Sequence, residues 1–306
     1  MTATTTGGKS LARHERISGM LFIAPWLIGF LIFSLGPMAG SFYLSLCKYD
    51  LHSLEWVGAE NYRRLLTSDA LFWRALQNTV IYVLFAVPLG LAGSLIIAIL
   101  LNQNVRGQRF FRTCFYLPSL VPAVASSLLW LWVLNSENGL LNYGLTWIGV
   151  PHRLCPRWLE DPAWTLPAFI LMSLWGIGGA RMIIFLAGLQ GISESYYEAA
   201  TIDGASNLQK FGHITLPLLS PTIFFNLILG IIGSFQVFTS AYVMTSGGPG
   251  NASLFYVLYL FRNAFEYFKL GKASALAWIL FAVLLGFTLI QFQNARKWVH
   301  YEGGND

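Results

Sequence analysis

Six long apolar segments, separated by shorter polar ones, dominate the pattern of hydrophobic and polar positions along the chain. Each has about twenty or more residues, which lets a helix cross the roughly 30 Å hydrocarbon core of a bilayer, and a helix satisfies its own backbone hydrogen bonds there. The pattern therefore predicts an all-α integral membrane protein with six transmembrane helices. The predicted helices lie near residues 17–46, 75–101, 113–134, 164–189, 219–245 and 273–293.

These helices are expected to form a single transmembrane domain, residues 17–296, between two polar tails, residues 1–16 and 297–306. The first apolar run is longer than the roughly 7 to 15 apolar residues of a secretory signal peptide, so we expect it to remain as the first helix. Between helices, residues 48–74 suit an amphipathic surface helix, and residues 136–162, rich in Gly, Pro and Trp, suit a loop with short helical pieces.

The polar segment 190–218, between the fourth and fifth predicted helices, mixes polar residues with aromatic and aliphatic ones, which is the composition of a docking element. A short helix is predicted from Ser193 to Ile202, with a serine at its N-cap. Asp203 and Gly204 then break this helix, because glycine tolerates the backbone angles of a sharp turn and aspartate bends the chain through its carboxylate. A second short helix begins near Ala205 and is closed by the prolines that follow. The segment is thus predicted to form a helix-turn-helix elbow.

The same segment carries a motif of small, acidic and apolar residues. It comprises Glu198-Ala199-Ala200, Asp203-Gly204-Ala205, Ile214, Leu216 and Pro217. In type and spacing these residues resemble the EAA loop of permease subunits in ATP-binding cassette importers. Gly188-Leu189-Gln190 and Ser246-Gly247-Gly248-Pro249 resemble the carbohydrate-uptake branch, the relatives of maltose and glycerol-3-phosphate permeases. Length and hydropathy agree from about Arg16 to Trp298.

The resemblance implies a non-catalytic permease subunit in the bacterial plasma (inner) membrane, with both termini and the EAA-type elbow in the cytoplasm. It implies four kinds of partner: a second homologous permease, two ATP-binding cassette ATPase subunits, an extracytoplasmic solute-binding protein, and membrane lipid. ATP and Mg²⁺ would act on the ATPase subunits, and no cofactor is expected on this chain. The solute would be a sugar or a sugar-like molecule. The residues that the resemblance places at the ATPase contact are Glu198, Ala199, Ala200, Asp203, Gly204, Ala205, Phe211, Leu216 and Pro217.

Composition agrees with a membrane location. The chain is 55% hydrophobic and 11% charged, whereas about a quarter of the residues of a soluble protein are charged. The net charge of +5 is spread over loops and tails, so it indicates lipid headgroups rather than nucleic acid. The 3 cysteines are odd in number and far apart, and they predict neither a disulfide framework nor a metal site.

The orientation is predicted from the link between Asn102 and Arg112, which carries three arginines and no acidic residue. Short loops rich in Lys and Arg stay in the cytoplasm. Counted over all loops, the basic residues favour neither side, so this short link decides the orientation. Both termini then lie on the same, cytoplasmic side.

The sequence predicts no catalytic site, because no histidine or acidic residue is placed beside a buried nucleophile. The 5 histidines fall in predicted loops or tails, and the acidic residues fall outside the predicted helices. No pair of carboxylates is therefore expected at membrane depth to act as acid and base or to bind a coupling ion. A self-contained channel or ion-coupled secondary transporter is the alternative to a pump subunit, and it has no use for a long docking segment with apolar side chains.

The fourth and fifth helices carry residues that suit a sugar site. An indole covers the apolar C–H face of a sugar ring, hydroxyl and amide groups pair with its hydroxyls, and glycines leave room for it. The same glycines also suit close helix packing, and that alternative stays open. The predicted substrate residues are Ser173, Trp175, Gly176, Arg181, Gly230, Ser234 and Gln236.

Arg181 is the one charged residue within the fourth predicted helix. It lies about eight residues, or roughly 12 Å, from the helix end at Leu189, which is far for a side chain to reach the interface. An arginine at the bilayer centre costs at least about 2.5 to 3.5 kcal/mol. We therefore expect it to face a wet cavity, which would favour an anionic or hydroxyl-rich solute, or to anchor two helices through a partner carboxylate.

Overall fold

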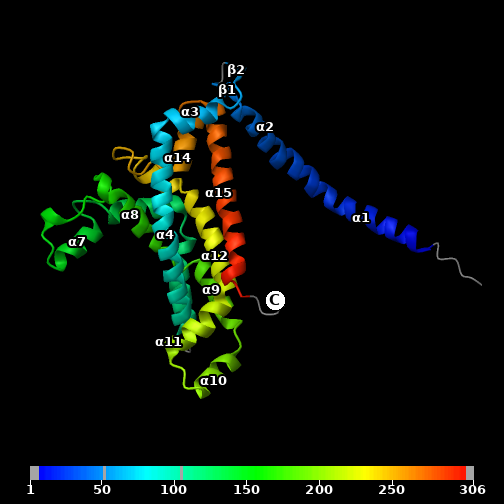
Figure 1. Cartoon of the computed structure of the whole chain (residues 1–306). Helices are drawn as coiled ribbons and strands as arrows, with labels where there is room; N and C mark the ends of the chain where they lie inside the picture. Colours follow the sequence, from blue (N-terminus) through cyan, green and yellow to red (C-terminus); the bar gives the residue numbers. More distant parts are fainter. Residues whose placement is uncertain (1–6, 51–52, 104–105, 301–306) are drawn as a thin grey trace, which may run out of the picture. The chain divides into compact units, whose positions relative to one another are not determined.

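Helices account for most of the regular structure in the computed structural model, which describes residues 7–50, 53–103 and 106–300 (Figure 1). Within these ranges the one sheet is a hairpin of β1 (Cys47–Tyr49) and β2 (Leu54–Trp56), which pair antiparallel with Lys48 opposite Glu55. The outer ends of the predicted tails lie outside the described residues. The contacts divide the chain into two units, Met1–Arg64 with Asn263–Ile279, and Leu65–Arg262 with Leu280–Asp306.

The first unit holds the first apolar span and the short elements that follow it. The stretch Glu15–Ser45 is helical throughout and is long and apolar enough to cross a membrane. Asn61 ties the elements after this span together, because its Nδ2 donates to the carbonyl oxygens of Ser45 and Cys47, each at 2.8 Å. The elements are α1 (Gly7–Phe30), the π-helical turn η1 (Leu31–Leu35), α2 (Gly36–Ser45), β1, β2, the start of α3 (Glu60–Ser68), most of η5 (Arg262–Glu266) and the start of α15 (Leu270–Trp298).

The second unit contains most of the helices. Three further stretches are long and apolar enough to cross a membrane, Ala70–Asn102, Asn207–Met244 and Leu270–Trp298. Besides the ends of α3 and α15, the elements are α4 (Ala70–Asn102), α5 (Gln108–Tyr116), η2 (Leu117–Leu120), α6 (Ala123–Val133), α7 (Leu140–Trp147), η3 (His152–Leu154), α8 (Pro162–Leu174), α9 (Ala180–Gln190), α10 (Glu194–Ile202), α11 (Asn207–Lys210), η4 (Phe211–Thr215), α12 (Leu216–Phe235), α13 (Thr239–Met244) and α14 (Tyr256–Phe261).

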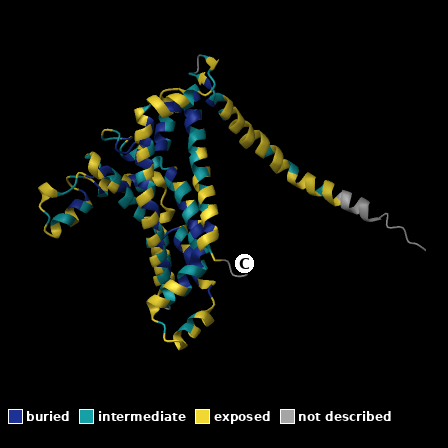
Figure 2. Ribbon diagram, in the orientation of Figure 1, coloured by how far each residue is buried: buried dark blue, intermediate teal, exposed yellow. Residues whose placement is uncertain are grey.

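The core of the second unit forms where α4 packs against α9 and α12. Its buried apolar cluster comes from these three helices and consists of Ile97, Ala98, Leu101, Met182, Phe185, Leu186, Leu189 and Leu219. Other large side chains of α4, such as Leu84, Ile96 and Leu100, are exposed (Figure 2). Lipid chains are as apolar as leucine, so close packing rather than apolar burial holds such helices together.

Buried polar side chains of α4 tie it to distant segments of the same unit. Asn78 donates through Nδ2 to the carbonyl oxygens of Asn251 at 2.8 Å and Leu254 at 3.1 Å. The hydroxyl of Thr79 accepts from the backbone N–H of Tyr256 at 2.9 Å. These bonds satisfy backbone groups of the irregular chain before α14, as the low-dielectric surroundings require.

The helix predicted near residues 113–134 is broken. Gln108–Leu120 and Ala123–Val133 meet at a bend of 96°. Pro118 stands in η2 and Pro122 at the N-cap of α6. Proline has no N–H to donate and disfavours helical geometry in the residue before it, so the helix ends here. The expectation of a continuous helix was wrong because the apolar composition runs unbroken across both prolines.

The helix predicted near residues 164–189 is also broken, into α8 and α9, with turns between them at residues 175–179. Three glycines stand in this break. A Cβ on Gly178 would collide with the carbonyl group of Phe115, and one on Gly179 would lie 2.9 Å from Cβ of Ser119. Close contact with α5 and η2 thus requires glycine at both positions. The hydroxyl of Ser94 on α4 donates to the carbonyl oxygen of Ile177 at 2.7 Å and satisfies a backbone group within the break.

Of the other predictions about secondary structure, some are confirmed and some are not. The four other predicted helices are present as long helical stretches, and residues 136–162 form a loop with the short helices α7 and η3, as predicted. His14 lies in α1 just before the candidate span that begins at Glu15, whereas His213, predicted in a loop, stands in the π-helical turn η4 within a candidate span. His52 lies outside the described residues.

The contact at Gly178 predicts a specific defect. In Gly178→Ala the new Cβ and the Phe115 carbonyl cannot occupy their present positions, so the backbone must shift. Overpacking of this kind costs about 1–3 kcal/mol. We expect a lower thermal unfolding midpoint for the purified chain in detergent. Gly233→Ala is the matched control, because nothing lies within 4 Å of its Cβ position. Equal losses in both variants would contradict the assignment.

Candidate functional sites

The segment from α10 to α11 forms two short helices joined by a sharp turn. Gly204 has φ of +79°, a left-handed conformation that glycine adopts without strain. Ser206 then caps α11 in a reciprocal arrangement, in which its backbone N–H donates to Oε1 of Gln209 at 2.7 Å and its Oγ accepts from the N–H of Gln209 at 3.4 Å. The predicted turn is therefore present, although Ser193 occupies the N-cap of α10 without a side-chain cap bond.

The prolines do not close this segment, contrary to expectation. Helical structure continues from α11 through the π-helical turn η4 into α12, so Asn207–Met244 counts as one candidate span. The N–H of Leu216 donates to the carbonyl of Phe211, five residues earlier. Pro217 therefore stands within a continuous helical stretch, directly after the π-helical turn. The second short helix is therefore the first turn of a long one.

Two side-chain contacts hold α10 against the start of that long helix, and one backbone bond closes the turn between them. The hydroxyls of Tyr197 and Thr215 lie 3.0 Å apart, within hydrogen-bonding distance. Nζ of Lys210 donates to Oγ1 of Thr201 at 2.6 Å. Across the turn, the N–H of Ala205 donates to the carbonyl of Ala200 at 2.9 Å. The orientation of α10 is thus set by side chains on both arms of the segment.

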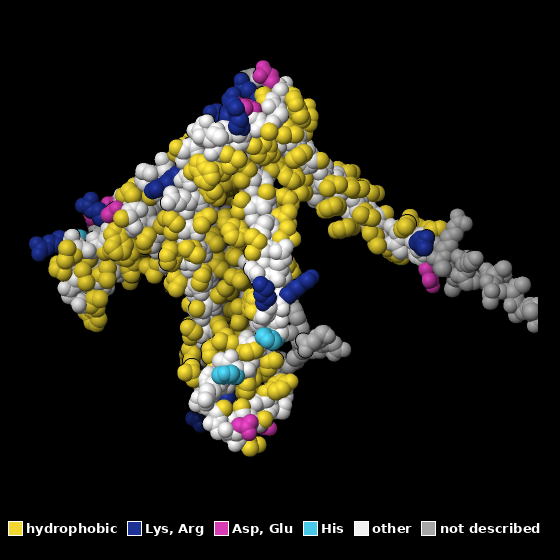
Figure 3. Space-filling model, viewed as in Figure 1, with side chains coloured by type: hydrophobic (Ala, Val, Ile, Leu, Met, Phe, Trp, Pro, Cys, Tyr) yellow, Lys and Arg dark blue, Asp and Glu magenta, His cyan; other side chains and the backbone are white. Residues whose placement is uncertain are grey.

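The residues predicted to contact an ATPase divide into two groups by exposure. Glu198, Ala199, Asp203 and Gly204 are exposed, whereas Ala200, Ala205, Phe211, Leu216 and Pro217 are partly buried behind them. Two large apolar side chains near the turn are strongly exposed: Ile202, at the end of α10, is 87% exposed, and Leu208, in α11, is 79% exposed. In Figure 3 the end of the molecule that carries α10 shows hydrophobic side chains among acidic and histidine ones. The surface is therefore polar and apolar together.

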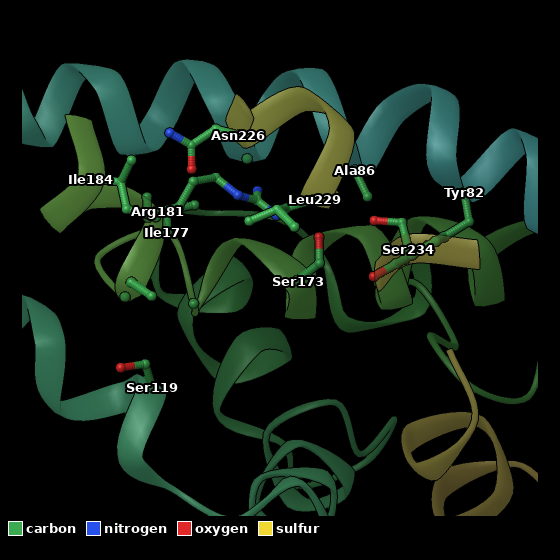
Figure 4. A pocket seen from close by; sticks show the side chains of 14 residues that line it. Tyr82, Ala86, Ser119, Ser173, Ile177, Arg181, Ile184, Asn226, Leu229 and Ser234 are labelled. Atoms are coloured by element: carbon green, nitrogen blue, oxygen red, sulfur yellow. The ribbon is translucent and has the colours of Figure 1, made fainter. Parts of the chain in front are cut away.

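A second candidate site is a cavity of about 410 Å³ among α4, α8, α9 and α12, with Ser119 at one side (Figure 4). Four of the predicted substrate residues line it, namely Ser173, Gly176, Arg181 and Ser234. Its volume falls in the range of about 300–1,000 Å³ that is usual for small-molecule sites.

Arg181 lies in the first turn of α9 and extends into this cavity (Figure 4). Two glycines make room for its guanidinium. A Cβ on Gly90 would lie 2.6 Å from Nη1, and one on Gly230 would lie 3.5 Å from Nη2. Gly230, predicted as a substrate residue, thus lies beside the guanidinium, while Gly90 was missed by sequence reasoning.

Tyr82 and Asn226 also line the cavity and were not predicted. Asn226 is 1% exposed, and its Nδ2 donates to the carbonyl of Thr222 at 3.1 Å. Each is a single polar residue in an apolar run, and that isolation is the sequence signal that could have identified them.

Three predicted substrate residues, Trp175, Gly230 and Gln236, are not among those that line the cavity. Trp175 packs edge-on against Trp130, with ring centroids 6.0 Å apart, and Gln236 is exposed at the end of α12. The described part of the chain has no group of three His, Cys, Asp or Glu side chains placed to hold a metal ion.

Within the described residues, four helical stretches long and apolar enough to cross a bilayer, two of which line a cavity with hydroxyl, amide and guanidinium groups, indicate a multi-pass membrane protein. The chain belongs to the family of binding-protein-dependent transport system inner membrane components, whose model matches residues 86–296. It is therefore a permease of the ATP-binding cassette importers, as the EAA-type motif predicted.

Individual permease proteins are similar in sequence to this chain over most of its length. A probable ABC transporter permease protein of Bacillus subtilis, YesP, is 42% identical over 294 residues, which are 95% of this chain and 94% of the relative. The lactose transport system permease protein LacF of Rhizobium radiobacter is 35% identical, over 96% of this chain and 99% of the relative. Among solved structures, the chain matches one in the crystal structure of a bacterial alginate ABC transporter, which is in complex with an alginate pentasaccharide-bound periplasmic protein. The two chains are 25% identical and superpose with a TM-score of 0.80, over 94% of this chain and 96% of that chain.

The contact between Tyr197 and Thr215 predicts that Tyr197→Phe loosens α10. Loss of one hydrogen bond lowers the free energy of local opening by about 1 kcal/mol, which corresponds to roughly fivefold faster amide exchange. Hydrogen exchange of residues 194–204, followed by mass spectrometry, measures this change. Tyr196→Phe is the matched control on the same helix, since the Tyr196 hydroxyl has no hydrogen bond to a described residue and its side chain is half exposed. Unchanged exchange in Tyr197→Phe would show that the bond does not hold α10.

Proposed function

We propose that this chain forms, with a second homologous permease, the membrane pathway of an ATP-driven importer for a sugar or sugar-like solute. The cavity among α4, α8, α9 and α12 is the observation that carries the proposal, because hydroxyl, amide and guanidinium groups in a space of about 410 Å³ suit a polyhydroxylated solute. The names of the relatives support this class of solute. An extracytoplasmic binding protein would deliver it, and ATP and Mg²⁺ would act on two partner ATPase subunits.

The residues proposed to contact the solute are the polar ones that line the cavity. Hydroxyl groups come from α4, α8 and α12, an amide from α12, and a guanidinium from α9. They are Tyr82, Ser173, Arg181, Asn226 and Ser234, with Gly176 leaving space beside them. Trp175, Gly230 and Gln236 stay predictions with no place among the lining residues.

The alternative, a self-contained channel or ion-coupled carrier, is disfavoured. The residues that line the cavity include no carboxylate to bind a coupling proton or cation. Transport by this family depends instead on a separate binding protein. A permease of this kind carries no reaction of its own, and the energy comes from outside the chain.

The topology that fits this function has six crossings. Four are the long helical stretches, and a fifth is the bent pair from α5 to α6. We propose that the shorter apolar helices α8 and α9 together make the sixth. An even number of crossings leaves both termini on one side. The three arginines of residues 102–112, one before α5 and two within it, favour the cytoplasmic side of a bacterial inner membrane. The turn between α10 and α11 then also faces the cytoplasm.

The α10 to α11 segment is proposed to dock on an ATPase subunit. Exposed Ile202 and Leu208 offer apolar contact, and exposed Glu198 offers a charge for a basic residue of the partner. Ile202 lies outside the candidate spans and Leu208 lies in the first turn of one of them. Aliphatic side chains at 87% and 79% exposure are costly in water and are favoured when a partner covers them.

We expect Glu198→Lys and Gly204→Val to uncouple ATP hydrolysis from transport. The first reverses the charge at the contact. The second forces a β-branched residue to φ near +79°, which costs about 1–3 kcal/mol. Uptake into proteoliposomes that hold the complete transporter should fall at least about tenfold in each variant, while the ATPase subunits still co-purify.

Glu194→Lys is the control for the charge reversal, because Glu194 is exposed in the first turn of the same helix and lies outside the motif. Full uptake in both Glu198→Lys and Gly204→Val, with the ATPase subunits retained, would overturn the docking assignment.

The orientation predicts a labelling pattern. Single cysteines at Arg109 and Asn138, both exposed positions, are introduced into a chain whose native Cys47, Cys114 and Cys155 are replaced. A membrane-impermeant thiol reagent should label intact spheroplasts at position 138 and not at position 109. Disruption of the membrane should expose position 109 as well. Labelling of position 109 in intact cells would invert the topology.

A further inference from the structure

Arg181 places a positive charge in the cavity without a counter-charge. The guanidinium stays protonated in proteins and has five N–H groups to donate. Among the described residues, no ion pair and no hydrogen bond involves this side chain, and no acidic residue lines the cavity. Donors of a charged group that lack partners in the protein are available to a ligand.

The end of α9 adds to this positive character. Gly179, Ala180 and Arg181 all line the cavity, and α9 begins at Ala180. The first N–H groups of a helix have no partner within the helix and carry a partial positive charge. The helix end and the guanidinium therefore act on the same space, and both favour an anion there.

The surroundings of the guanidinium distinguish this role from that of a helix anchor. An anchoring arginine pairs with a carboxylate or with backbone carbonyls of a neighbouring helix, and no such bond is present among the described residues. Instead, Gly90 and Gly230 leave a gap for the head group, because a Cβ at Gly90 would lie only 2.6 Å from Nη1.

The rest of the lining supplies groups for the remainder of a solute. Tyr82 and Ser234 lie at one end of the cavity, and the Ser173 hydroxyl lies between them and the Arg181 side chain (Figure 4). Asn226 lies on the other side of Arg181. A molecule with one anionic group and several hydroxyls matches this arrangement.

We infer that the solute carries a carboxylate, as a sugar acid or an oligosaccharide of uronic acids does, and that Arg181 binds this carboxylate in the cavity. The inference rests on the proposed function and narrows its substrate class. A planar guanidinium binds a carboxylate through two parallel N–H···O bonds, which a neutral sugar cannot accept in the same way.

The test uses the complete transporter, with its partner permease, ATPase subunits and binding protein, in proteoliposomes. The probes are digalacturonate, its dimethyl ester, which has the same rings without the charges, and a panel of neutral disaccharides. We expect ATP-dependent uptake of the acid and at least about tenfold less uptake of the ester and the neutral sugars. A charge-assisted bidentate contact accounts for a factor of about 10 to 100.

Variants locate the effect. Arg181→Gln should lower uptake of the acid at least about tenfold at equal complex assembly. Arg181→Lys keeps the charge but cannot bind a carboxylate through two parallel N–H groups, so it should retain part of the uptake of the acid. Arg153→Gln, at an exposed position in η3, removes a like charge elsewhere and should leave uptake unchanged. Where Arg181→Gln fails to assemble, the comparison of acid and ester in the unaltered complex decides.

Uptake of neutral sugars in preference to the acid would overturn the inference and leave the proposed function in place. So would unchanged uptake of the acid in assembled Arg181→Gln. A complex that imports no sugar of either kind with ATP would overturn the proposed function itself, and the inference with it.

Discussion

Within the hydrocarbon of a bilayer, a polar group that leaves a regular helix must find its partner inside the protein, and the organisation of this chain follows from that requirement. The interruption between α8 and α9 frees backbone groups, and Ser94 of α4 bonds to one of them at the carbonyl of Ile177. The irregular chain before α14 is satisfied in the same way by Asn78 and Thr79. One long helix thus supplies both the apolar contacts of the core and the polar contacts that permit irregular structure beside it.

Arg181 is an exception, because its polar group has no hydrogen-bond partner among the described residues. Its guanidinium lies in a cavity, is accommodated by two glycines, and makes no bond to the described residues. A group so costly at membrane depth is tolerated because the cavity can admit water and solute. The glycines near the cavity differ in their contacts: Gly178 and Gly179 pack closely against α5 and η2, Gly90 and Gly230 lie beside the guanidinium, and Gly176 lines the cavity.

Length and hydropathy were sufficient to predict the continuous spans, and the sequence Asp203-Gly204 was sufficient to predict the turn after α10. The breaks between α5 and α6 and between α8 and α9 were missed, because apolar side chains continue through both and the local prolines and glycines were outweighed. Part of the cavity was anticipated, since Ser173, Arg181 and Ser234 were recognised as polar residues within apolar helices. Tyr82 and Asn226 were not, because which face of a helix meets a cavity depends on contacts between helices that are far apart in the chain.

The continuity of α11, η4 and α12 has a mechanical consequence. Asn207, at the turn, and Asn226, at the cavity, belong to one helical stretch, and nineteen residues at about 1.5 Å each separate them by roughly 28 Å. A flexible hinge at Pro217 would have absorbed a push applied at the turn. Because helical structure continues past Pro217, a displacement of the turn at Gly204 would shift the part of α12 that carries Asn226 and Ser234 at the wall of the cavity.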